Sequence, residues 1–157
     1  MTKIFVLGAR TSTGGRVIQA LQAERDGVFT DDHAFGDSAA LNRGFVLDQL
    51  RRFGPFNTFI NVLASPSDGL ICAADALPYL IEQPLRVLSA ADDLWGERDR
   101  RLIIINGLEL PHAWAQCERL ILERLLEQAP RILRDTMPAL EVSTLRAEEA
   151  IKFPNFI

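Results

Sequence analysis

The chain has 157 residues, enough for one ordinary domain but too few for two independent cores. Hydrophobic residues make up 48% and charged residues 24%, a typical globular composition that argues against disorder. The net charge of -4 comes without a basic stripe, which argues against nucleic-acid binding. No apolar run approaches the roughly 18 residues of a membrane span, and no signal sequence precedes the first strand, so we expect a cytoplasmic protein.

Short apolar runs alternate along the chain with segments whose apolar residues recur at helical spacing. Short apolar runs bounded by turn residues predict strands at 3–7, 28–30, 34–36, 58–63, 101–107 and 140–145. Apolar residues at helical spacing predict helices at 15–25, 41–53, 68–81, 85–94 and 111–128. This alternation predicts a doubly wound parallel sheet with helices on both faces, a single three-layer domain over 1–157 with a short tail at 150–157.

A glycine-containing loop joins the first strand to the first helix. Gly8 permits a tight turn after the strand, and Gly14 lets backbone amides approach a phosphate at the positively polarised helix N-terminus. The spacing is not the regular G-x-G-x-x-G, so the prediction depends on the position of the loop between strand and helix. The loop and the alternating elements together predict a Rossmann-like fold.

Residues 8–21 resemble the cofactor loop of short-chain dehydrogenases/reductases, which has the pattern G-x-x-x-G-x-G. Gly8 and Gly14 fall on the outer glycines, and Ser12 takes the place of the middle one. The resemblance implies that this loop binds NAD or NADP, with the Ser12 hydroxyl able to contact phosphate.

The resemblance continues further along the chain. Asp37 falls where the family has an acidic residue near the adenine. The segment from Asn61 to Ala64 resembles the end of the family's strand that carries Asn-Asn-Ala-Gly, although Ser65 replaces the final glycine. The resemblance therefore implies that Asp37, Asn61 and Ala64 lie at the cofactor.

Two charged sites give conflicting predictions about the cofactor. Arg10 in the loop favours the 2′-phosphate of NADP, whereas Asp31 or Asp32 favours the ribose hydroxyls of NAD. Arg10 as a solvated loop charge and the two aspartates as a turn are the alternatives.

The catalytic residues of the family have no match here. Gly107 stands near the position of the catalytic serine, and His112 and Gln116 stand at the Tyr-x-x-x-Lys spacing. Glutamine cannot supply the positive charge that lowers the pKa of a catalytic phenol. His112 is left as the candidate general acid or base, with a helix cap or a surface residue as the alternative.

Three interpretations of the function are open. The favoured one is a non-catalytic, degenerate short-chain-dehydrogenase-like protein that acts as a partner or assembly subunit, because the Ser, Tyr and Lys equivalents are missing. The alternative is an NAD(P)H-dependent oxidoreductase with an atypical catalytic set, and a flavodoxin-like module is more remote. The apolar helix around 120–126 predicts that something covers it on both sides. The resemblance implies a homo- or hetero-oligomer formed through this region, and a helix buried within the monomer is the alternative. Cys72 and Cys117 lack metal-ligand spacing, so we expect no metal site.

Overall fold

The computed structural model describes residues 3–7, 12–30, 51–52, 54–64, 100–107, 116–136 and 140–157. The predicted strand at 34–36 and the predicted helices at 68–81 and 85–94 lie outside these residues. Of the helix predicted at 41–53, only Arg51 and Arg52 are described, and both are helical.

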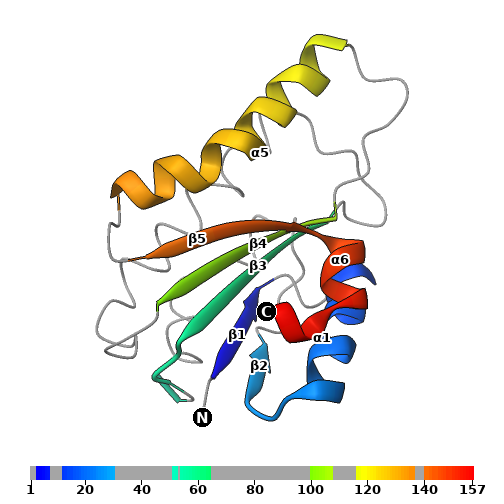
Figure 1. Cartoon of the computed structure of the whole chain (residues 1–157), viewed down its shortest axis with the longest axis vertical. Coiled ribbons are helices and arrows are strands. Elements are labelled where there is room, and N and C mark those ends of the chain that lie inside the picture. Colours follow the sequence, from blue (N-terminus) through cyan, green and yellow to red (C-terminus); the bar gives the residue numbers. More distant parts are fainter. Residues whose placement is uncertain are drawn as a thin grey trace.

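Five parallel strands form one sheet (Figure 1). They are β1 (Ile4–Leu7), β2 (Val28–Thr30), β3 (Thr58–Ala64), β4 (Arg101–Gly107) and β5 (Glu141–Arg146), in the order β2-β1-β3-β4-β5. The predicted strands in the described residues are confirmed, and so is the doubly wound parallel architecture. Because β2 and β3 flank β1 on opposite sides, the direction of winding reverses between β1 and β3. Open α/β sheets bind their ligands at such a reversal, outside the carboxyl ends of the strands.

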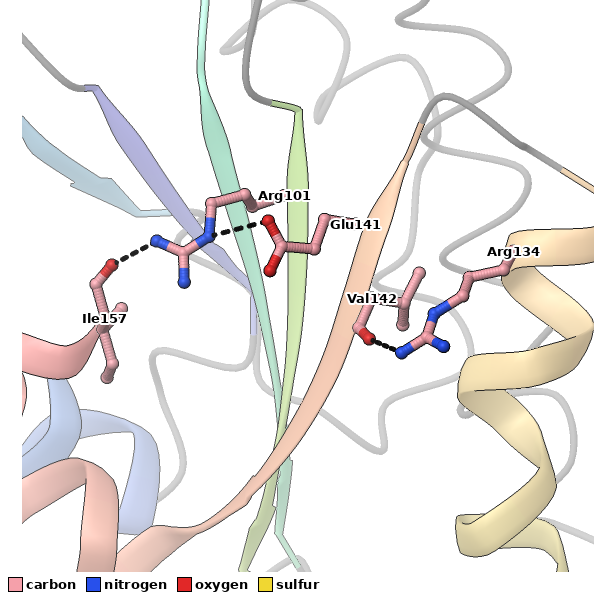
Figure 2. A network of polar contacts seen from close by, with 5 residues as sticks. All are labelled: Arg101, Arg134, Glu141, Val142 and Ile157. Carbon is pink, nitrogen blue, oxygen red and sulfur yellow. Dashed lines mark hydrogen bonds and ion pairs between the residues drawn. The ribbon is translucent and has the colours of Figure 1, made fainter.

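Helices lie on both faces of this sheet. α1 (Ser12–Glu24), α6 (Ala147–Lys152) and the 3-10 helix η3 (Pro154–Phe156) pack together on one face. α5 (Gln116–Thr136) runs along β5 on the other face, as Figure 2 shows by the placement of Ile157 and Arg134 on opposite sides of the sheet. No helix in the described part of the chain is long and apolar enough to span a membrane.

Alternating side chains of the strands build a core on each face, since successive Cβ atoms of a strand point to opposite sides. On the α1 face, the sheet and its covering helices bury a cluster of ten residues: Ile4, Val6, Val17, Leu21, Ile60, Val62, Ile103, Ile105, Ala150 and Ile157. On the other face, the ring of Phe5 lies 5.2 Å from that of Phe56 and 5.6 Å from that of Phe59. Burial on both faces explains why these strands are continuous apolar runs in the sequence.

Two predicted helix boundaries are wrong. α1 begins at Ser12 rather than Gly15, because its first turn consists of small polar residues that the apolar spacing does not register. α5 runs through Pro130 to Thr136 rather than ending at 128. A proline inside a helix removes one hydrogen bond. Here the fully buried side chains of Ala129 and Leu133 hold the last turns against the sheet.

The segment after β5, predicted to be a short tail, packs onto the domain. The side chain of Ile157 is only 2% exposed and belongs to the core cluster on the α1 face. Arg25 Nη2 donates a hydrogen bond to the carbonyl oxygen of Asn155 at 3.0 Å. Arg101 Nη1 does the same to the carbonyl oxygen of Ile157 at 2.9 Å (Figure 2). Phe153, by contrast, is 56% exposed.

Candidate functional site

The carboxyl edge of the sheet is uneven at the reversal point. Leu7, the last residue of β1, lies beside Asn61 of β3, and Asn61 lies beside Ile104 of β4. β3 and β4 therefore continue past the end of β1, to Ala64 and Gly107. The chain leaves β1 at this step and enters α1 at Ser12.

The first turn of α1 is built from the small residues Ser12, Thr13, Gly14 and Gly15. Gly14 is buried and Gly15 is exposed. The first N–H groups of a helix have no intrahelical acceptor, and the helix dipole makes this end positive. The small residues allow an anion to approach the backbone closely, so this end of α1 fits a phosphate group.

A cavity of about 300 Å³ opens beside this helix end. It is lined by Thr13 and Arg16 of α1, by Asn106 and Gly107 at the end of β4, and by Arg146 with residues of α6. Arg16 and Arg146 are both exposed, and Glu148 is the acidic residue among the lining residues. Two guanidinium groups against one carboxylate make the cavity cationic, and guanidinium groups bind phosphate through paired hydrogen bonds.

The structure brings four of the predicted cofactor residues to the carboxyl part of the sheet. Ser12 and Gly14 lie in the first turn of α1, Asn61 lies beside the last residue of β1, and Ala64 ends β3. The side chain of Asn61 is 1% exposed and alternates with Ile60 and Val62, so it lies on the face opposite α1. Its role as a cofactor ligand stays a prediction.

The remaining predicted site residues lie outside the described residues. They are Gly8, Arg10, Asp31, Asp32, Asp37 and the candidate acid or base His112. The structure neither places them at the cavity nor separates them from it.

The sequence analysis missed the polar residues of the cavity, among them Arg16, Asn106 and Arg146. A positional signal was available, because Asn106 and Arg146 each come at the end of a predicted parallel strand, and such strand ends share one edge of the sheet. Arg16 follows the glycines directly and was read only as part of the first helix. Within the described residues, no group of three His, Cys, Asp or Glu side chains could hold a metal ion.

Comparisons with known proteins identify the fold. No protein-family model and no curated protein sequence matches the chain. Among solved structures, BdcA from E. coli is similar with a TM-score of 0.66 at 15% identity, over 99% of this chain and 88% of BdcA. A short-chain dehydrogenase/reductase from Serratia marcescens gives 0.63 at 16% identity, again over 99% and 88%.

A third similar structure was solved with a nucleotide. Gre2 from Candida albicans, in complex with NADPH, gives a TM-score of 0.59 at 13% identity over 93% of this chain and 57% of Gre2. At these identities the similarity concerns the fold. The chain has the Rossmann fold of the short-chain dehydrogenases/reductases.

Proposed function

We propose that this Rossmann domain binds NAD or NADP and acts as a non-catalytic partner or assembly subunit. The cationic cavity beside the N-terminus of α1 is the observation that carries the nucleotide part. It combines two independent attractions for phosphate, the positive helix end and the guanidinium groups of Arg16 and Arg146.

The size of the cavity limits which part of the nucleotide it would take. Its volume of about 300 Å³ is at the lower end of the range for small-molecule sites. A phosphate and the adjoining sugar would fit, whereas a whole dinucleotide needs further surface. Gly8, Arg10 and Asp37 remain our candidates for that surface, through the resemblance of their positions to the family's cofactor loop.

The residue types at the catalytic positions support a role without dehydrogenase chemistry. β4 ends in Asn106 and Gly107, neither of which carries the hydroxyl that the family supplies from this strand. His112 and Gln116 stand at the spacing of the family's tyrosine and lysine, and glutamine cannot supply the positive charge that the lysine gives to lower the pKa of the general acid.

An exposed apolar stripe on α5 supports assembly with another subunit. Ile121, Leu125 and Ile132 recur at spacings of four and seven residues and so share one side of the helix. Ile121 is 51% and Ile132 39% exposed, while the neighbouring Leu133 is fully buried against the sheet. A second helix laid along this stripe would remove it from water, and we propose a homo- or hetero-oligomer formed through α5.

The test is a calorimetric titration of the purified protein with NADH and with NADPH. We expect Arg16→Gln to weaken binding by about tenfold, the effect of losing one charge-assisted contact to phosphate. Arg124→Gln is the matched control, because Arg124 is exposed on α5, away from the residues that line the cavity. Absence of binding heat with both nucleotides would refute the nucleotide part.

A second measurement separates the non-catalytic role from the oxidoreductase alternative. Oxidation of NADPH is followed in the presence of a panel of aldehydes and ketones, and we expect no turnover. Turnover that His112→Ala abolishes, with binding retained, would replace the non-catalytic proposal by the oxidoreductase.

A further inference from the structure

The outer edge of β5 offers backbone hydrogen-bonding groups. β5 is the last strand of the described sheet, and the N–H of Glu141 donates to the carbonyl oxygen of Arg100 at 2.9 Å. Because backbone groups of a strand alternate in direction, those of Val142, Thr144 and Arg146 point away from β4.

Side chains occupy the two ends of this edge. Arg134 Nη2 of α5 donates to the carbonyl oxygen of Val142 at 2.6 Å (Figure 2). The N–H of Arg146 donates to Glu149 Oε2 at 3.0 Å. Between them, the outward N–H and C=O of Thr144 form no hydrogen bond with a described residue. An unpaired edge of this kind is a template for a further strand.

A cavity of about 470 Å³ runs along the same edge, between β5 and α5. Its apolar lining comes from both elements: Leu126 and Pro130 of α5, and Val142 of β5. Thr144 lies in the middle of the strand residues that line it. A groove between an edge strand and a helix accommodates alternate side chains of a peptide that pairs with the strand.

The charges of the groove favour an acidic occupant. Its two carboxylates are engaged, Glu127 by Arg124 Nη1 at 3.0 Å and Glu149 by the N–H of Arg146. The guanidinium groups of Arg134 and Arg146 lie on exposed residues, and Arg134 uses one nitrogen for Val142. The N–H that Glu149 accepts is neutral, so Glu149 keeps its negative charge. With Glu127 paired to Arg124, the two guanidinium groups face this one carboxylate and leave a net positive charge.

We propose that the outer edge of β5 binds an extended acidic peptide segment of another protein, which adds a strand at Thr144 and places alternate side chains in the groove beside α5. This surface adjoins the nucleotide cavity through Asn106 and Arg146. The proposal does not depend on nucleotide binding, so its tests use Thr144 and Arg134, which line only the groove.

The experiment selects peptides from a phage-displayed random library and measures the affinity of synthetic copies by fluorescence anisotropy. We expect peptides rich in Asp and Glu among β-branched residues. Thr144→Pro removes the outward N–H without affecting the pairing with β4, so the protein keeps its fold and binding falls by about tenfold or more. Thr144→Val keeps the N–H and binds as the wild type does. Arg134→Gln weakens the binding of the acidic peptides but not the binding of copies that carry Asn and Gln in place of Asp and Glu.

A second probe serves if Thr144→Pro fails to fold. Two versions of the selected peptide are then made, each methylated on one of the two alternating sets of backbone nitrogens. Only one set faces β5 in a paired strand, so we expect only the version methylated on that set to lose binding to the wild-type protein. The proposal is overturned if selection yields no peptide that depends on Thr144 or on backbone pairing. It is also overturned if the wild-type protein dimerises and Thr144→Pro dissociates the dimer, because the occupant would then be a second copy.

Discussion

Replacement of Ile157 by alanine is expected to destabilise the whole domain. Ile157 is 2% exposed and packs in the core cluster with Val17 and Leu21 of α1. The substitution removes the buried equivalent of three methylene groups, worth about 2.4 kcal/mol in transfer free energy. A residual cavity adds to this cost and places the range for such substitutions at about 2–5 kcal/mol. Because the cavity borders η3, a short element able to move inward, we expect about 2–3 kcal/mol.

Urea unfolding followed by circular dichroism measures this loss. The expected change corresponds to a fall in Tm of about 5–10 °C for a domain of this size. Phe153→Ala is the matched control, since Phe153 is 56% exposed and its removal should cost less than about 0.5 kcal/mol. Equal unfolding free energies for the two variants would show that Ile157 is not part of the core.

Three further outcomes are expected. Thr58→Val should raise the free energy of unfolding by about 1 kcal/mol in the same urea assay, because the buried Thr58 hydroxyl has no hydrogen-bond partner among the described residues. A loss of stability would contradict this. Arg101→Met should lower the free energy of unfolding by about 1 kcal/mol, because the hydrogen bond to Ile157 is lost. Glu141→Gln should lower it by less than about 0.5 kcal/mol, since the 3.8 Å ion pair of Glu141 with Arg101 is solvated. The reverse ranking would be inconsistent with the structure. Ile132→Asp should leave stability within about 0.5 kcal/mol and dissociate the oligomer in sedimentation velocity, and a monomeric wild type would rule out assembly through α5.

Local patterns were sufficient to predict the five strands that the structure describes. Residues 59–60, 62–63 and 102–105 are apolar on both alternating sets of positions, which is typical of a strand buried on two faces. Local patterns were insufficient at the helix ends, because the boundary of a helix depends on tertiary contacts as well as on the spacing of apolar residues. The buried Ala129 and Leu133 carry α5 past Pro130, a residue that on its own predicts a stop.

The candidate site was predictable where its residues are neighbours in sequence. Ser12 and Gly14 belong to a glycine-containing stretch whose position between a strand and a helix predicts phosphate binding. Arg146 is separated from Arg16 by most of the chain, so no local pattern connects them. They line one cavity because parallel strands end at one edge of the sheet and the order of those strands brings β5 and α1 to the same part of it.

The sequence by itself determined the strand content, the glycine loop and the alternation that makes this an α/β protein, since these depend on residues a few positions apart. Only the tertiary structure decided the strand order, the burial of Ile157 and the groove beside Thr144. Each of these depends on which distant segments pack together, and the free energy of that packing is a property of the assembled surfaces rather than of any one segment.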